Sequence, residues 1–278
     1  MKKFSWILPL LALTISAVSC APKAQSSKAL VLYYSQSENT RVVAEAIAER
    51  TGADIERIEA VQPYDGTYQE TIARGNQERA QGVNPPIQPL SHNIADYDVI
   101  FLGYPIWYGT YALPVATLLD EVDFSGKTLV PFCTFGSGGL DSSVRDLQAK
   151  EPQATILPGY GVRAARIAAV PTEVERFLMQ NGFIEGECEA LEEFPEAHPA
   201  TEEESAIFDA AVADYPMIRA KAETVTSRAI PGGTEYLFTA TDTPRPGMPQ
   251  MPQMPAMQMK VYVTALEGEA PVFTQVVR

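Results

Sequence analysis

The sequence has little histidine and little cysteine, and its acidic residues far outnumber its basic ones. It contains two histidines and three cysteines in 278 residues. None of them cluster with the spacing of zinc ligands, so a zinc enzyme is excluded and no metal site is predicted. Lysine and arginine number 21 against 35 aspartates and glutamates, which gives a formal net charge of −14. Because nucleic acid binding needs a basic surface, this charge argues against a nucleic acid partner.

The first 19 residues predict a signal peptide. Two lysines precede an apolar run from Trp6 to Val18 that is too short to span a bilayer comfortably. The residues Ala-Val-Ser-Cys that end at Cys20 resemble the lipobox of bacterial lipoproteins, which implies lipidation of Cys20. The alternative is ordinary cleavage with an incidental cysteine. We expect residues 20–28 to form a lipidated tether that anchors the protein to a membrane of the bacterial cell envelope, outside the cytoplasm.

Strands and helices are expected to alternate between residues 29 and 186. Apolar, β-rich runs predict the strands, and runs with helical spacing predict the helices between them. The expected strands are 29–34, 54–59, 98–103, 127–134 and 154–157, and the expected helices are 40–50, 68–79, 115–121, 141–150 and 172–181. Such alternation is typical of βαβ units, so it predicts an α/β domain with a doubly wound, five-stranded parallel sheet.

An acidic segment, residues 187–204, is the expected linker between this domain and the rest of the chain. The stretch from Glu185 to Glu204 has nine acidic residues, no lysine or arginine and two prolines, a composition that favours solvation over packing. Residues 205–278 then show one helical run, 205–214, and four β-rich runs, 218–230, 234–241, 258–266 and 271–277. They predict a small α+β domain with an antiparallel sheet.

A polar loop, Ser35–Thr40, follows the first strand and opens directly into a helix. Hydroxyl groups on Ser35, Ser37 and Thr40, with N–H groups at the positive end of the helix dipole, suit a phosphate monoester. The alternative is an ordinary helix cap, for which serine and threonine need no ligand. Taken alone, the loop leaves both interpretations open.

Two further loops follow neighbouring strands of the predicted sheet. The segment Gly103–Tyr111 crowds tyrosines and a tryptophan together, where they either cover a flat aromatic ligand or pack over the end of the sheet. The segment Thr134–Gly139 is rich in glycine, so its backbone can approach a ligand closely and offer N–H donors. Because ligands of open α/β sheets bind outside the carboxyl ends of the strands, the three loops together predict one binding site.

These motifs resemble those of a known family. With Tyr-Ser-Gln-Ser-x-Asn-Thr in the first loop and Gly-Tyr-Pro-Ile-Trp-Tyr-Gly in the second, residues 29–184 resemble a flavodoxin, especially the bacterial flavodoxin-like branch. The resemblance implies FMN as cofactor, with its phosphate on the first loop and its isoalloxazine ring between the other two. The implied binding residues are Ser35, Gln36, Ser37, Glu38, Asn39 and Thr40, followed by Tyr104, Pro105, Ile106, Trp107, Tyr108, Gly109, Phe135, Gly136, Ser137, Gly138 and Gly139.

Glu38 departs from the family pattern, which usually has glycine at this position. A carboxylate beside the phosphate is expected to weaken FMN binding unless it points to solvent. If the position requires a positive φ angle, glutamate also costs backbone strain.

The C-terminal residues 205–278 resemble a cystatin in outline, chiefly in Arg228–Tyr236 and Lys260–Val263. Ser227 and Pro231 depart from the cystatin hairpin, so the resemblance implies a binding or spacing module rather than an inhibitor.

For the whole chain, we expect an FMN-binding lipoprotein that acts in electron transfer and has no catalytic side chain of its own. Its expected partner is a redox protein or a small quinone-like acceptor. One alternative is an NAD(P)H-dependent FMN quinone reductase. The other is a cofactor-free binding or protease-inhibitor lipoprotein that uses its cystatin-like domain.

Overall fold

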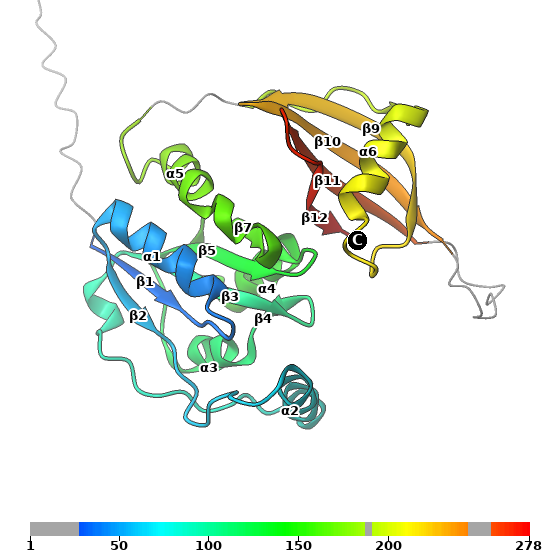
Figure 1. Ribbon diagram of the computed structural model, residues 1–278. Helices are drawn as coiled ribbons and strands as arrows, with labels where there is room; N and C mark the ends of the chain where they lie inside the picture. Colours follow the sequence, from blue (N-terminus) through cyan, green and yellow to red (C-terminus); the bar gives the residue numbers. More distant parts are fainter. Residues whose placement is uncertain (1–27, 187–190, 244–256) are drawn as a thin grey trace, which may run out of the picture.

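The computed structural model describes residues 28–186, 191–243 and 257–278 (Figure 1). The predicted signal peptide and Cys20 lie outside the described residues. Within them, the chain forms a parallel sheet flanked by helices and then a smaller antiparallel sheet with one helix, which confirms the predicted fold class. Among these residues, no helix combines the length and the apolar character needed to cross a membrane.

The three predicted loops follow β1, β3 and β5 of the larger sheet, at the edge formed by the carboxyl ends of its strands. Its parallel strands are β1 (Ala29–Tyr33), β2 (Asp54–Arg57), β3 (Val99–Trp107), β5 (Thr128–Phe135), β6 (Thr155–Ile156) and β7 (Tyr160–Arg163). They lie in the order β2-β1-β3-β5-β6, with β7 also pairing with β5. This is the strand order of one of the two common doubly wound folds, in which β1, β3 and β5 end at the same edge.

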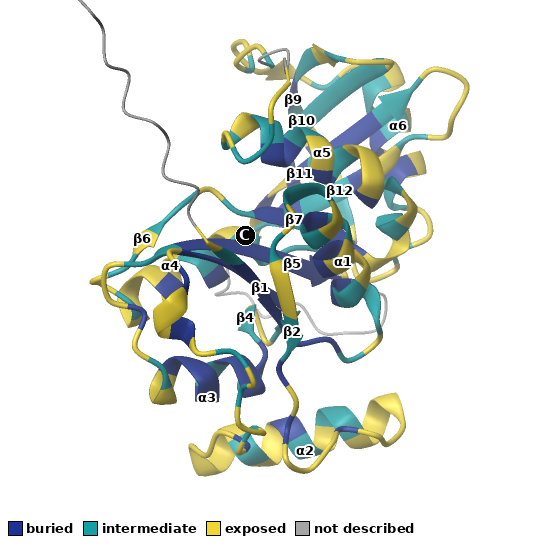
Figure 2. Cartoon of the chain, turned by 90° about the vertical axis from the view of Figure 1, so that its left-hand side faces the viewer, coloured by how far each residue is buried: buried dark blue, intermediate teal, exposed yellow. Residues whose placement is uncertain are grey.

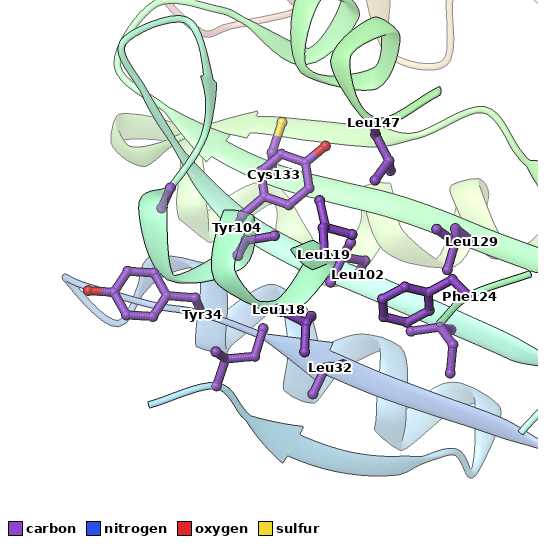
Figure 3. Packing of buried hydrophobic residues seen from close by; sticks show 14 of the residues in the cluster. Leu32, Tyr34, Leu102, Tyr104, Leu118, Leu119, Phe124, Leu129, Cys133 and Leu147 are labelled. Atoms are coloured by element: carbon purple, nitrogen blue, oxygen red, sulfur yellow. The ribbon is translucent and has the colours of Figure 1, made fainter. Parts of the chain in front are cut away.

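Two hydrophobic clusters cover the two faces of this sheet. The helices are α1 (Asn39–Thr51), α2 (Tyr68–Gln81), α3 (Leu113–Glu121), α4 (Leu140–Lys150) and α5 (Val170–Gln180), with short 3-10 helices at Ile94–Asp96 and Ala164–Ala169. Side chains alternate along β1, so Leu32 packs beneath α3 and α4 while Val31 packs beneath α1 and α5. Figure 3 shows the first cluster, with Leu118 of α3 near Leu32 and Leu147 of α4 on the opposite side of the cluster from Leu32.

Helix α2 lies largely outside both clusters. Gly75 is its one buried residue, and Figure 2 shows the rest of the helix as exposed or intermediate. Its sequence has a capping box, in which the Thr67 side chain accepts from the N–H of Glu70 and Glu70 accepts from the N–H of Thr67. Local capping therefore defines where this helix begins, although it buries little apolar surface.

Two strands differ from the prediction. The strand expected to end at Gly103 continues to Trp107, because Ile106 and Trp107 pair with β4 (Thr110–Tyr111) in an antiparallel hairpin. The strand expected over 154–157 is β6, and the chain returns to the sheet as β7. The additional strand β7 pairs with the last four residues of β5 and so supports the glycine-rich loop that follows it.

The smaller sheet has the strand order β12-β11-β10-β9-β8, and all of its pairs are antiparallel. Its elements are β8 (His198–Pro199), α6 (Glu202–Val212), β9 (Ala220–Ile230), β10 (Gly233–Asp242), β11 (Gln258–Leu266) and β12 (Val272–Val277). Helix α6 packs on one face, where Phe208 meets Phe238.

Helix α6 begins at Glu202, three residues before the predicted start at Ser205. Thr201 caps it, and Glu204 completes a capping box. The acidic residues of the first turn are therefore part of the helix, where they interact favourably with its positive end. The prediction placed them in a solvated linker because it counted charge without considering this cap.

Glu56 attaches β2 to the segment before β3. Its carboxylate accepts hydrogen bonds from the N–H groups of Ser91 (2.5 Å) and His92 (3.0 Å) and from both of their side chains. Burial acts to raise the pKa of Glu56, but these hydrogen bonds outweigh it and hold the pKa below its ordinary value of 4.5. The ionised carboxylate therefore stabilises the fold at neutral pH, and this contribution is lost as the pH falls through the lowered pKa.

We expect Glu56→Gln to lower the free energy of unfolding at pH 7 by about 1.5 kcal/mol, because a hydrogen-bonded charge is lost. The difference from the unsubstituted protein should shrink below about pH 4.5. There the Glu56 carboxylate becomes protonated, first in the unfolded chain and then in the folded protein. Urea unfolding at several pH values measures this, with exposed Glu59→Gln as the matched control. A difference that stays constant from pH 7 to pH 3.5 would contradict the assignment.

Candidate functional site

The loop Ser35–Thr40 joins β1 to α1 and presents a row of backbone donors. The Ser35 hydroxyl accepts from the N–H of Arg41 at 3.3 Å, and the Thr40 hydroxyl lies 2.9 Å from that of Thr134 in β5. By contrast, the backbone N–H groups of Gln36, Ser37, Glu38, Asn39 and Thr40 donate to no acceptor among the described residues. These donors lie at the positive end of the α1 dipole, which suits an anion such as a phosphate group.

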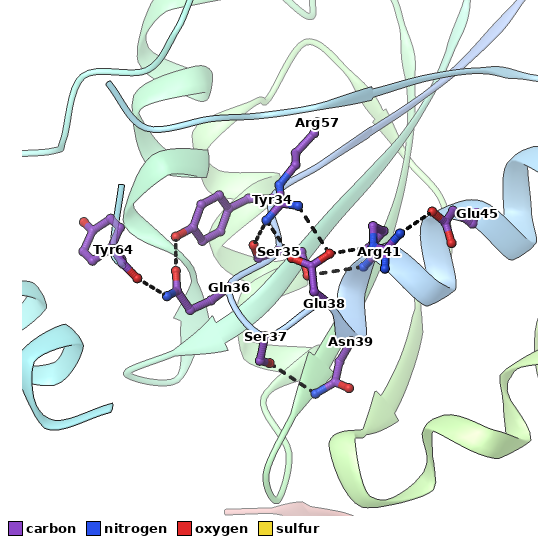
Figure 4. A network of polar contacts seen from close by, with 10 residues as sticks. All are labelled: Tyr34, Ser35, Gln36, Ser37, Glu38, Asn39, Arg41, Glu45, Arg57 and Tyr64. Atoms are coloured by element: carbon purple, nitrogen blue, oxygen red, sulfur yellow. Dashed lines mark hydrogen bonds and ion pairs between the residues drawn. The ribbon is translucent and has the colours of Figure 1, made fainter. Parts of the chain in front are cut away.

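The polar side chains of this loop are held by neighbours (Figure 4). The Tyr34 hydroxyl donates to Oε1 of Gln36 at 2.6 Å, and Nε2 of Gln36 donates to the carbonyl of Tyr64. Nδ2 of Asn39 donates to the Ser37 hydroxyl at 3.2 Å. The side chains therefore fix the shape of the loop and leave the backbone donors free.

Glu38 has a φ angle of 63°, in the left-handed region, so the strain expected for a glutamate at this position is present. Its carboxylate turns toward two arginines, with Arg57 Nη2 at 2.9 Å from Oε1 and Arg41 Nε at 2.5 Å from Oε2. Hydrogen bonds from Arg57, supported by its charge and by Arg41, lower the pKa of Glu38. The acidic charge that was expected to oppose a phosphate is thus paired with two cations (Figure 4).

Arg57 was not identified from the sequence. It also donates to the carbonyl of Ser35 at 2.6 Å and so contacts the loop twice. Its position could have been predicted, because β2 lies beside β1 in a doubly wound sheet of this kind. Arg57, near the end of β2, therefore lies next to Tyr33, just before the loop that follows β1.

The aromatic segment is a tight hairpin between β3 and β4. Its turn residues Tyr108 and Gly109 have φ angles of 55° and 87°, and two successive positive values define a type I′ turn. The Tyr108 hydroxyl donates to the carbonyl of Ile72 at 3.2 Å, and the Arg79 guanidinium lies 4.2 Å from the ring. Contact with α2 therefore offsets the strain of a bulky residue in this conformation.

The other aromatic residues lie at different depths. Trp107 is partly buried and packs edge-on against Tyr34 (5.8 Å) and Tyr64 (5.1 Å). Tyr104 is fully buried, and its hydroxyl donates to Ser143 at 3.2 Å. Of the two interpretations, packing against the protein applies to Tyr104, because its position in β3 directs the side chain into the core beneath α4 (Figure 3). Its ring is therefore not available to cover FMN, as the resemblance implied.

A cleft of about 460 Å³ lies between the hairpin and the glycine-rich loop. Ile106 and Gly109 form one wall and Gly136–Gly139 another. Phe135 also lines the cleft, although its side chain is buried. Pro105, Trp107, Tyr108 and the loop Ser35–Thr40 do not line it. The lining also includes Tyr68, Tyr215 and residues 275–278. The hydroxyl of Thr110, which belongs to the hairpin, is buried without a hydrogen-bond partner among the described residues.

A second hollow, of about 720 Å³, lies between residues 87–95 and 121–127. These residues precede β3 and β5, so the hollow is at the amino ends of the strands. Although it is larger, it contains none of the three loops. The edge with the free backbone donors is the stronger candidate, because ligands of open α/β sheets bind at the carboxyl ends.

The residues of this edge fit FMN. Free N–H donors at the start of α1 suit the phosphate group, and the cleft between two loops suits a flat ring with a polar rim.

Comparison with known proteins gives a consistent result. A family model described as Flavodoxin matches residues 28–173. NAD(P)H dehydrogenase (quinone) 3 of Rhizobium meliloti is 30% identical over 130 residues, which are 42% of this chain and 58% of that protein. The chain therefore spans less than two thirds of that relative's length.

Three solved structures are similar to about half of this chain. A candidate flavoprotein of Bacteroides eggerthii is 29% identical to this chain, with a TM-score of 0.46. A candidate flavoprotein of Bacteroides uniformis is 25% identical, with a TM-score of 0.48. Each match covers 54% of this chain and 98% of the other protein. A flavoprotein of Lactobacillus acidophilus, solved in complex with FMN, is 24% identical with a TM-score of 0.43, over 52% of this chain and 99% of its own.

Proposed function

Because this chain belongs to the flavodoxin family, whose model covers more than half of it, we propose that it is an FMN-binding protein that acts in electron transfer. The observation that carries the proposal is the row of free N–H donors at Gln36–Thr40, which follows β1 at the same ends of the strands as the cleft beside β3 and β5. When bound, FMN supplies the redox chemistry, and the protein supplies binding and orientation.

The roles of the chain's own residues follow from their positions. The loop Ser35–Thr40 holds the phosphate, and the Thr40–Thr134 contact fixes this loop against the end of β5. Ile106 and Gly109 on one side and Gly136–Gly139 on the other line the cleft and would hold the ring.

A second candidate is an NAD(P)H-dependent quinone reductase. The observation that favours it is the similarity to NAD(P)H dehydrogenase (quinone) 3 of Rhizobium meliloti. The two candidates differ in whether reduced nicotinamide is consumed. Loss of NAD(P)H absorbance on addition of a quinone to the FMN-loaded protein would favour the reductase, and no loss would favour the carrier.

The export, anchoring and C-terminal assignments are proposals from the sequence. We propose that Cys20 carries a lipid that holds the protein on the bacterial cell envelope; unchanged membrane fractionation of a Cys20→Ala variant would contradict this. We also propose that the cystatin-like region serves as a binding or spacing module. The cofactor-free inhibitor remains its alternative, and inhibition of a papain-type protease by FMN-free protein would support it.

We expect FMN to quench the fluorescence of Trp107 when it binds. The chain has two tryptophans, Trp6 and Trp107, so a fragment that starts at residue 28 contains Trp107 alone. Trp107 belongs to the hairpin whose residues Ile106 and Gly109 line the cleft, so it lies within reach of energy transfer to a flavin bound there. Titration of the fragment should show saturable quenching together with shifted flavin absorbance bands.

The control for this titration is Trp107→Phe, which should keep the absorbance shift and lose the protein emission. Riboflavin, which lacks the phosphate, should bind more weakly than FMN. No absorbance shift at saturating FMN would overturn the proposed function.

A further inference from the structure

The smaller domain contacts the glycine-rich loop of the larger one. In β12, the N–H of Val276 donates to the carbonyl of Ser137 at 2.6 Å. A Cβ atom added to Gly138 would lie 2.1 Å from the carbonyl oxygen of Val276, and one added to Gly136 would lie 3.0 Å from the Tyr215 hydroxyl. Glycine at position 138 is therefore needed for the close approach of β12.

Arg163, the last residue of β7, connects the same two parts. Its Nε donates to the carbonyl of Gly136 at 2.9 Å, and its Nη1 donates to the carbonyl of Phe273 at 3.0 Å. The guanidinium lies 3.4 Å from the centre of the Phe273 ring. The residue is 8% exposed and has no carboxylate partner within the described residues. Its buried charge is stabilised by backbone carbonyls and by an aromatic face instead.

These contacts fix the direction of two peptide groups. The described chain contains no cis peptide, and in a trans peptide the N–H points away from the carbonyl. Because the carbonyls of Gly136 and Ser137 face Arg163 and β12, the N–H groups of Ser137 and Gly138 face the other way. Neither N–H donates to an acceptor among the described residues, and both residues line the cleft opposite Ile106.

We propose that the smaller domain completes the flavin site. Arg163 and Val276 are positioning residues that hold the Gly136 and Ser137 carbonyls, so that the N–H groups of Ser137 and Gly138 donate to the polar edge of the isoalloxazine ring. The charge of Arg163 also polarises the peptide that it contacts, which strengthens the N–H on its far side. This inference rests on the proposed function, since it requires FMN in the cleft.

The test compares two variants in the full chain. Arg163→Met removes both hydrogen bonds of the guanidinium, and Val276→Pro removes the N–H that donates to Ser137. Because β12 is an edge strand and this N–H points away from its neighbour β11, proline breaks no hydrogen bond of the sheet. Its ring also occupies the position of the lost hydrogen and so moves the Ser137 carbonyl out of its place. The control is Arg166→Met, which loses the same charge from the same segment but removes an ion pair with Glu173.

Arg163→Met and Val276→Pro are each expected to bind FMN roughly tenfold more weakly than the unsubstituted protein. A tenfold loss corresponds to one hydrogen bond to a charged or polarised group. The midpoint potential of bound FMN should fall, because the reduced ring carries more negative charge at the edge that these donors stabilise. Arg163→Lys should recover part of both losses, and Arg166→Met should change neither.

The outcomes separate the two proposals. If the unsubstituted protein binds FMN and both variants match it in affinity and potential, the role of the smaller domain is overturned and the proposed function stands. If the unsubstituted protein does not bind FMN, the proposed function fails, and this inference fails with it. If circular dichroism shows that Arg163→Met does not fold, Val276→Pro alone decides.

Discussion

Replacing Arg57 with methionine is expected to weaken FMN binding about tenfold, since a like-charge contact near a surface costs on the order of 1.4 kcal/mol. Arg57 now pairs with Glu38 and holds the Ser35 carbonyl. Without it, Arg41 alone would balance a carboxylate that lies in the phosphate loop. Fluorescence titration with FMN at low and high salt measures the effect, which should be smaller at high salt.

Two further variants test whether charge is the cause. Glu38→Gly in the Arg57→Met background should restore binding, because it removes the unpaired carboxylate and relieves the left-handed backbone strain. Arg50→Met, at the far end of α1, changes the net charge equally and should leave the affinity unchanged. If Arg57→Met bound FMN as tightly as the unsubstituted protein, the carboxylate of Glu38 would not oppose the phosphate.

Gly103→Ala is expected to lower the free energy of unfolding by about 3 kcal/mol, at the upper end for overpacked cores. A Cβ atom at Gly103 would lie 2.2 Å from Cζ of Phe132, whose ring is fully buried in the neighbouring strand β5. The ring cannot move aside without displacing the cluster around it. Urea unfolding followed by circular dichroism measures the change.

The control for Gly103→Ala is Gly126→Ala. A Cβ atom at Gly126 meets nothing within 4 Å, so only its φ angle of 75° opposes the substitution, which should cost about 1 kcal/mol. Gly103 lies within β3 and has no positive φ angle, so backbone conformation does not oppose its replacement by alanine. A loss no larger than that of Gly126→Ala would therefore contradict the clash with the Phe132 ring. Phe132→Leu in the Gly103→Ala background should recover part of the loss.

Much of the larger domain could be predicted because its strands are continuous apolar runs. The run 98–103 marks β3 and the run 127–134 marks β5, and both loops that follow them lie where the sequence placed them. The hairpin at Trp107–Thr110 was missed because it needs Tyr108 at a positive φ angle. Local propensity opposes this conformation, and only contact with α2 makes it stable.

The charge balance of the site could not be predicted, because it depends on residues that meet only after folding. Glu38 could be recognised as a departure from the family, but its ion pair with Arg57 spans 19 positions in the sequence. The contact between Arg163 and Phe273 spans 110 positions. An arginine at the end of a short strand has no local pattern that reveals which carbonyl it will bind.

The position of β12 also protects the smaller sheet against self-association. An edge strand normally offers its outward N–H and C=O groups to strands of other molecules. In β12, the outward N–H of Val276 and the carbonyl of Phe273 are already bonded within the chain. A strand from a second copy would therefore have to displace these bonds before it could pair with β12.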